Sequence, residues 1–221
     1  MRKGLTELVF VLDRSGSMEG LESDVIGGYN SFLNNQRKVD GQVYVSTVLF
    51  DDEITVLHNR KDIRDVKTLT EKDYYVGGCT ALLDAVGDAI KHIGKVHKHT
   101  REEDKPEHVI FFINTDGYEN ASRKYNYEDI KSMIDFEKEK YNWEFIFMGA
   151  NIGSENVASQ LGINENRAVD WFCDEDGIEH SYKLIDNIVS CCRSMDKVTA
   201  NNCMDELCYA EKKYVERRKN K

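Results

Sequence analysis

Two apolar runs in this sequence each end in an aspartate. Residues 8–12 lead directly into Asp13, and residues 109–113 lead into Asp116. Runs of this length and apolar character are typical of buried strands. Residues just past the carboxyl ends of parallel strands lie where open α/β sheets bind their ligands. The pattern therefore predicts an α/β sheet with two acidic residues at its ligand-binding edge.

Strand-like and helix-like segments alternate along the chain, which is typical of a three-layer, doubly wound sheet with helices on both faces. A short strand at 54–57 lies close enough to the strand before it for a hairpin. We therefore expect it to be an antiparallel edge strand on an otherwise parallel sheet. The expected strands are 8–12, 42–50, 54–57, 109–113, 143–148 and 168–172, and the expected helices are 20–38, 81–97, 127–140, 157–161, 178–192 and 202–217.

Hydroxyl side chains accompany the two aspartates. Ser15 and Ser17 follow Asp13 at alternate positions, so three oxygens of one turn can point at one spot. Thr80 follows a glycine pair at 77–78, which lets the backbone approach a ligand closely, and it stands at the start of a helix. Hard oxygen donors without histidine or thiolate suit Mg²⁺, Mn²⁺ or Ca²⁺ rather than zinc. We therefore expect a divalent-cation site.

In this order, Asp13-x-Ser15-x-Ser17, Thr80 and Asp116 resemble the metal-ion-dependent adhesion site (MIDAS) of the von Willebrand factor type A (vWA) family, over roughly residues 5–172. The resemblance implies a Rossmann-like vWA fold in which these five side chains hold one divalent cation, Mg²⁺ foremost, with Mn²⁺ and Ca²⁺ as alternatives. It also implies that an Asp or Glu carboxylate of a partner protein completes the coordination. Because Thr80 stands on a separate loop, its engagement can be coupled to a movement of the following helix.

The end of the chain differs from the part before it, because two helices are expected there without a strand between them. We expect a vWA domain with the metal site over residues 1–173 and a C-terminal helical extension, packed on or following that domain, over residues 174–221. The six cysteines include no C-x-x-C pair with a matching partner, so we expect reduced thiols and neither a structural zinc site nor a disulfide framework. We also expect the Cys79 thiol to pack inertly, and His97 to be exposed at a helix end.

Charge and hydropathy exclude some classes of partner. The net charge of −10 leaves no domain-wide positive field for nucleic acid. No apolar run approaches the roughly 20 residues of a membrane span or resembles a signal segment, so we expect no membrane partner and a cytoplasmic location. The resemblance then points to intracellular bacterial or phage vWA proteins, which often serve with an ATPase or a stress-response component.

Enzyme motifs are missing from the sequence. Ser15 stands where an aspartyl phosphatase would need its second aspartate, and neither a P-loop nor a G-x-S-x-G elbow is present. We therefore expect a protein-binding module that is not an enzyme. Two alternatives stay open at this point. One is a metal-dependent hydrolase of a phosphorylated or nucleotide substrate, and the other is a scaffold that binds through its C-terminal helices.

Overall fold

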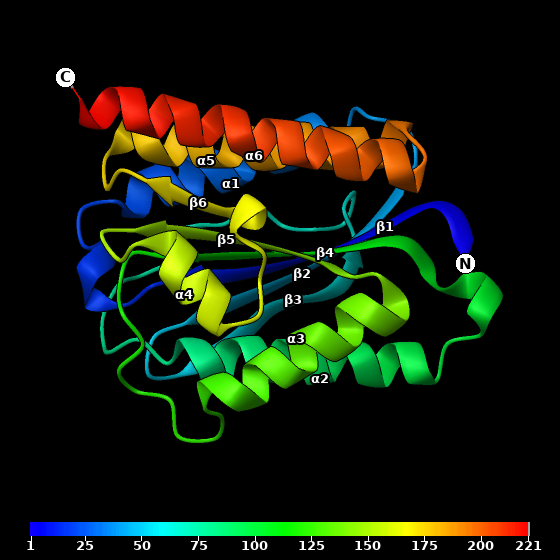
Figure 1. The fold of residues 1–221 in the computed structure, drawn as a ribbon, viewed down its shortest axis with the longest axis horizontal. Coiled ribbons are helices and arrows are strands. Elements are labelled where there is room, and N and C mark those ends of the chain that lie inside the picture. The colour runs from blue at the N-terminus through cyan, green and yellow to red at the C-terminus, as the bar shows by residue number, and fades with distance from the viewer. Residues whose placement is uncertain (221) are drawn as a thin grey trace.

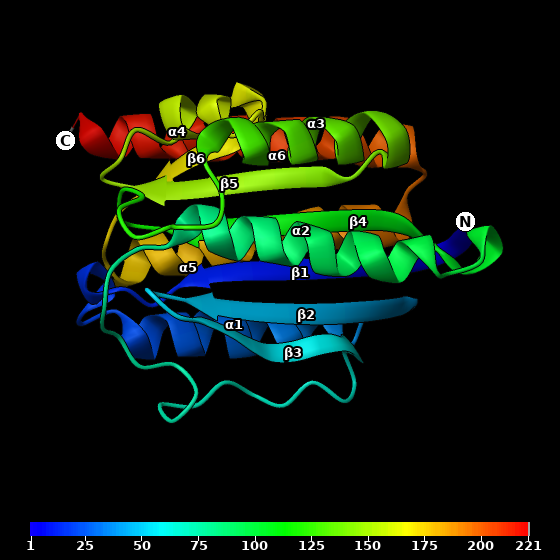
Figure 2. The same cartoon turned by 90° about the horizontal axis from the view of Figure 1, so that it is seen from below.

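The computed structural model describes residues 1–220 as a six-stranded sheet between two layers of helices (Figure 1). The strand order is β3-β2-β1-β4-β5-β6, which Figure 2 shows from below. Neighbouring strands are parallel except β2 and β3, which are antiparallel. The expected fold class, a doubly wound and mostly parallel sheet with one antiparallel edge strand, is confirmed.

The strands are β1 (Arg2–Asp13), β2 (Gln42–Phe50), β3 (Ile54–Asp62), β4 (Pro106–Thr115), β5 (Glu144–Ala150) and β6 (Ala168–Trp171). The helices are α1 (Glu22–Gln36), α2 (Leu82–Lys98), α3 (Tyr127–Tyr141), α4 (Ser154–Gln160), α5 (Glu175–Ser194) and α6 (Lys197–Lys219), and three short 3₁₀ helices are η1 (Gly16–Met18), η2 (Glu102–Asp104) and η3 (Glu165–Arg167). Each expected strand and helix is present, with shifted ends.

The apolar core lies on both faces of the sheet. Along β1, Phe10 and Leu12 face the layer of α1 and α5, whereas Val9 and Val11 face the layer of α2 and α3. Side chains of a strand alternate between faces, so a strand covered on both sides needs an unbroken apolar run. The helices α1, α5 and α6 lie on one side and α2, α3 and α4 on the other (Figure 1).

Strand β1 begins six residues earlier than expected, at Arg2, and it includes a buried and fully paired acid. Glu7 is 0% exposed, and its carboxylate accepts a 2.6 Å hydrogen bond from His97 Nε2 and is paired with the Arg60 guanidinium. Burial raises the pKa of Glu7, but the bonds from His97 and Arg60 outweigh it and hold this pKa below its usual value. The expectation that His97 is exposed was wrong, since it turns inward to Glu7.

The two C-terminal helices pack against the same sheet face as α1. Gly28 of α1 permits a close crossing, because a Cβ there would lie 2.2 Å from the ring of Tyr182 on α5. Helix α6 then packs on α5 and β6, burying Met204 and Cys208. Within residues 1–220, no helix has the length and apolar character needed to cross a membrane.

The expectation of six reduced cysteines was wrong for one pair. Cys191 of α5 and Cys203 of α6 form a disulfide, with their Cα atoms 6.6 Å apart. The short turn between the two helices folds them back on each other and brings these positions face to face. Sequence spacing alone carries no sign of this, because it depends on how the helices cross.

Candidate metal centre

Three loops meet at the carboxyl ends of the central strands. Asp13 ends β1, Asp116 follows the last residue of β4, and Thr80 lies just before α2. Strands β1 and β4 are parallel neighbours, so their ends and the two aspartates come to the same edge of the sheet. The region lies where the parallel strand arrows point, at the left of Figure 1.

Asp13 is held rigidly inside this edge. Its side chain is 1% exposed, and one carboxylate oxygen accepts a 2.7 Å bond from the Ser15 backbone N–H. The other oxygen accepts a 2.5 Å bond from the Thr115 hydroxyl, and the Tyr74 hydroxyl donates to the Asp13 backbone carbonyl at 2.5 Å. These contacts fix the orientation of the carboxylate from both sides.

The hydroxyls predicted as ligands lie beside the second aspartate. The Ser17 hydroxyl donates to one Asp116 oxygen at 2.5 Å, and the Ser15 and Ser17 oxygens are 3.2 Å apart. Gly117 lies between Thr80 and Ser17: a Cβ on it would lie 3.0 Å from the Thr80 hydroxyl and 3.3 Å from that of Ser17. The absence of a side chain at Gly117 therefore leaves room between these two oxygens.

Burial disfavours the negative charges of both carboxylates. It raises the pKa of Asp13 to about 6, more than the bonds from Thr115 and Ser15 lower it, and the nearby Asp116 charge adds to the rise. Burial also raises the pKa of Asp116, and this rise exceeds the lowering of the pKa by the hydrogen bond from Ser17. Two partly desolvated anions beside three neutral hydroxyls are a donor set that a hard divalent cation would stabilise.

The donor set is poor in charged ligands. Within residues 1–220 no group of three or more His, Cys, Asp or Glu is placed to hold a metal ion. A cation at this edge therefore depends on hydroxyl oxygens together with two carboxylates, which matches the chemistry predicted from the sequence and suits Mg²⁺ or Ca²⁺ rather than a thiolate-rich zinc site.

The loop that carries Thr80 is fixed by backbone contacts to its neighbours. The Asn120 side-chain oxygen accepts from the Thr80 N–H at 2.9 Å, and the Asn120 N–H donates to the Thr80 carbonyl at 3.0 Å. Gly77 donates to the Arg14 carbonyl at 3.0 Å. Gly78 has φ +70°, and a Cβ there would lie 1.8 Å from an Asp52 oxygen, so only glycine fits.

Arg14 occupies the first variable position of the Asp-x-Ser-x-Ser motif. Its side chain contacts the turn after β2 and the loop that leads to Thr80. It forms a buried ion pair with Asp51 at 2.9 Å, and its guanidinium lies 4.6 Å from the centre of the exposed Tyr75 ring. Asp51 also accepts from the Glu53 N–H at 2.6 Å, so it both shapes its turn and anchors Arg14.

Sequence reasoning missed three residues that touch the predicted ligands. Thr115 and Tyr74 hold Asp13, and the Cys173 thiol lies 3.9 Å from the second Asp116 oxygen. Cys79 is exposed, so the expectation that it packs inertly was wrong. Thr115 and Cys173 do have a signal, because both lie at the carboxyl ends of expected strands, where Asp13 and Asp116 were found.

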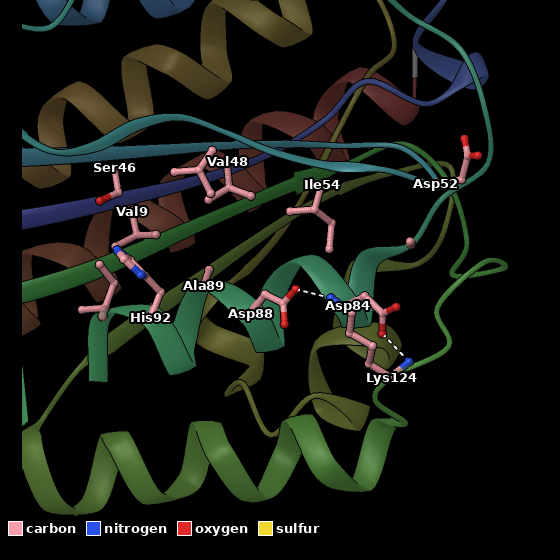
Figure 3. Close-up of a pocket in the computed structure, with 13 residues that line it drawn as sticks. Val9, Ser46, Val48, Asp52, Ile54, Asp84, Asp88, Ala89, His92 and Lys124 are labelled. Carbon is pink, nitrogen blue, oxygen red and sulfur yellow. Dashed lines mark hydrogen bonds and ion pairs between the residues drawn. The ribbon is translucent and has the colours of Figure 1, made fainter. Parts of the chain in front are cut away.

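A cavity of about 450 Å³ lies beside the Thr80 loop, between α2 and strands β2 and β3 (Figure 3). Its apolar wall includes Val9, Val48 and Ala89. Midway along α2, Asp88 pairs with Lys124 at 2.6 Å, and Asp52 and Ala81 line the end near the metal loop. The face of α2 toward β3 is therefore incompletely packed along this stretch.

Three solved structures have a similar fold at low sequence identity. Mussel byssus proximal thread matrix protein 1 with a zinc-occupied MIDAS motif has a TM-score of 0.54 and 17% identity over 82% of this chain and 46% of its own. A von Willebrand factor type A protein from Catenulispora acidiphila has a TM-score of 0.52 and 11% identity, over 82% of this chain and 41% of its own. The vWF domain of the pilus tip protein Mfa5 from Porphyromonas gingivalis has a TM-score of 0.55 and 12% identity, over 83% of this chain and 94% of its own.

These similarities show that the chain has the fold of vWA domains. The chain spans less than half of the mussel and Catenulispora proteins, and nearly all of the Mfa5 domain. No model of a known protein family matches the chain. No curated protein matches it in sequence.

Proposed function

We propose that this chain is a divalent-metal-dependent protein-binding module. Asp13, Ser15, Ser17, Thr80 and Asp116 hold one cation, Mg²⁺ foremost, and an Asp or Glu carboxylate of a partner protein completes its coordination. The observation that carries the proposal is the convergence of these oxygens from three loops at the carboxyl ends of β1 and β4. When bound, the cation supplies Lewis acidity and an open position for an anionic oxygen.

The residues of the site fit this role. Neutral hydroxyls coordinate a cation without cancelling its charge, so a cation held by only two carboxylates still attracts a third. Thr115, Tyr74 and Arg14 orient the loops before any partner arrives, which lowers the entropic cost of binding. The mussel protein with a zinc-occupied MIDAS motif supports a metal at this position of the fold.

The cavity beside α2 supports a switch at Thr80. Helix α2 begins two residues after Thr80, and the space between it and β3 lets the helix shift without compressing a filled core. A change in how Thr80 engages the cation would then be transmitted along α2. We propose this coupling as part of the same function.

We further propose that residues 1–173 form the metal-binding unit and that residues 174–221 form an extension packed on it. Buried α5 and α6 side chains in the core beside α1 support the packing. The proposed setting is the cytoplasm of a bacterium or a phage-infected cell, with an ATPase or a stress-response component as partner, and without an enzymatic activity of its own.

Capture of partners from a cell lysate tests the proposal. The tagged chain of residues 1–221 is compared with Asp13→Ala and with Glu53→Gln, which changes an exposed acid on a nearby turn. We expect a partner that the intact chain and Glu53→Gln retain in Mg²⁺, that EDTA releases, and that Asp13→Ala fails to bind. Binding that survives both EDTA and Asp13→Ala would contradict the proposal.

The two alternatives give different results with the same variants. A scaffold that uses its C-terminal helices would bind without the metal and would lose binding through changes on α6. A hydrolase would show metal-dependent turnover of a phosphate ester, lost in Asp13→Ala. Either outcome would replace the proposed function.

A further inference from the structure

A groove lies between α2 and α3, the two helices that Figure 2 shows side by side on one face of the sheet. Its volume is about 480 Å³, and its walls include Ile90 and Gly94 of α2 and Met133, Phe136 and Glu137 of α3. Phe136 is 49% exposed, so an apolar ring borders the groove on the solvent side. The groove thus combines apolar walls with one acidic side chain.

The acidic side chain of the groove is buried and has no partner. Glu137 is 7% exposed, and its Oε2 atom is buried without a hydrogen bond. Its Oε1 atom faces α2, because a Cβ on Gly94 would lie 3.2 Å from it. Burial raises the pKa of Glu137, more than the charges of His97 and Lys140 lower it. A buried carboxylate without a bonded partner is costly, so a cationic donor that reached it would stabilise it.

The lysines of this chain beside the groove are engaged elsewhere. The Nζ atom of Lys91 lies 4.5 Å from the centre of the Tyr125 ring. The Nζ atom of Lys140 lies 4.9 Å from the centre of the Phe136 ring. The Oε2 atom of Glu137 is therefore left without a bonded cation from residues 1–220.

We propose that this groove binds a lysine side chain of a partner protein. The apolar stem of the lysine lies along Ile90, Met133 and Phe136, and its ammonium donates to the carboxylate of Glu137. Lysine fits better than arginine, because only Oε1 faces the groove, whereas a guanidinium favours bidentate contact with both oxygens.

A protein fits this groove better than a small free amine does. Sites for small molecules enclose most of the ligand surface, whereas this groove opens to solvent beside the exposed Phe136 ring. Aromatic side chains and methionine, such as Phe136 and Met133, are enriched at protein interfaces. Charge complementarity between one ammonium and one unpaired carboxylate then selects a lysine as the residue that enters the groove.

The test is a titration of the ¹⁵N-labelled chain of residues 1–221 with a short peptide that carries one lysine between two alanines. We expect saturable shifts of the backbone N–H signals of residues 90–94 and 133–137, with a dissociation constant on the order of 1 mM for a single side chain. A peptide with norleucine in place of lysine keeps the stem and lacks the ammonium. We expect it to bind at least about tenfold more weakly.

Three variants assign the binding to the carboxylate. Glu137→Gln keeps the shape and removes the charge, so it should weaken binding of the lysine peptide by about tenfold or more. Glu139→Gln, a change of an exposed acid on the same helix, should leave the affinity within about twofold. Gly94→Ala places a methyl group 3.2 Å from Oε1 and should also weaken binding. Alanine favours a helix over glycine, so unfolding would not explain that loss.

Each contrary result overturns the proposal. Equal binding of the norleucine peptide, or equal binding of the lysine peptide by Glu137→Gln, would exclude the ion pair at Glu137. Shifts caused by butylamine but not by the lysine peptide would indicate a site for free amines, and no shifts in the groove would exclude both.

The result is separable from the proposed metal function. Gly94 lies roughly 20 Å along α2 from the loop that carries Thr80, so neither Mg²⁺ nor EDTA should change the affinity for the lysine peptide. A failure of metal binding would leave the lysine groove standing. A failure of the lysine peptide to bind would leave the metal site standing.

Discussion

Replacing Asp13 with asparagine is expected to stabilise the metal-free protein while it abolishes metal binding. The Asp13 carboxylate is buried, and burial disfavours its charge. Asparagine has nearly the same shape without the charge. Its amide can donate to the Thr115 hydroxyl, which then turns its proton to the Gly117 carbonyl 3.2 Å away. The native hydrogen bonds are thus replaced rather than lost.

The size of the effect follows from the pKa of Asp13. A rise from 3.8 to about 6 means that the folded protein holds this proton more tightly than the unfolded chain does. At about 1.4 kcal/mol per pKa unit, ionised Asp13 lowers the free energy of unfolding by about 3 kcal/mol above pH 6. Removing the charge returns up to this amount, and about 2–4 °C of Tm per kcal/mol gives a gain of up to about 6–12 °C.

The sign of the pH dependence follows from the same shift. Below pH 3.8 the carboxyl is protonated in both states and its contribution to stability is fully present. As pH rises from 3.8 through 6, the folded state must release the proton that it holds more tightly, so this contribution is lost. The Asp13→Asn advantage should therefore be large at pH 7.5 and should shrink toward zero near pH 4.

Thermal unfolding in EDTA, followed by circular dichroism at pH 4 and pH 7.5, measures this effect. Asp51→Asn is the matched control, since Asp51 is also a buried acid at this edge but is paired with Arg14, and its loss should lower Tm. A Tm for Asp13→Asn at or below that of the intact protein at pH 7.5 would refute the reasoning. It would mean that the charge of Asp13 does not destabilise the metal-free protein.

Three further outcomes are expected. Glu7→Ala should cost about 3–5 kcal/mol in urea unfolding, because it leaves Arg60 and His97 without their buried partner, and a loss below 1 kcal/mol would contradict this. Tyr74→Phe should cost about 1 kcal/mol in the same assay, since the hydroxyl that donates at 2.5 Å is removed, and an unchanged urea midpoint would argue against that bond. Thr80→Val keeps the side-chain shape but removes the oxygen, so calorimetry should show Mg²⁺ binding weaker by about tenfold or more, whereas equal affinity would exclude Thr80 from the site.

The architecture could be predicted from the sequence because its strongest signals are local. Residues 8–12 and 109–113 are apolar on both faces, and this alone requires strands covered on two sides. The acids that follow them must then lie at one edge, as Asp13 and Asp116 do. Both inferences use neighbours in the chain and the general geometry of parallel sheets.

The residues that sequence reasoning missed depend on contacts between distant segments. Glu7 is buried because Arg60 and His97 reach it from 53 and 90 residues away, and a polar residue before an apolar run gives no sign of such partners. The disulfide between Cys191 and Cys203 likewise depends on how two helices cross. Cys173 reaches Asp116 only through the order of β4, β5 and β6.

Calorimetric titration of Mg²⁺ into metal-free protein, beside Asp13→Ala and with Mn²⁺ and Ca²⁺ in parallel, tests the central claim most directly. The account predicts saturable binding of one cation per chain by the intact protein and its loss in the variant, because Asp13 anchors the oxygens of the site. An intact protein that binds none of the three cations, or a variant that binds as tightly as the intact protein, would contradict a metal centre at this edge of the sheet.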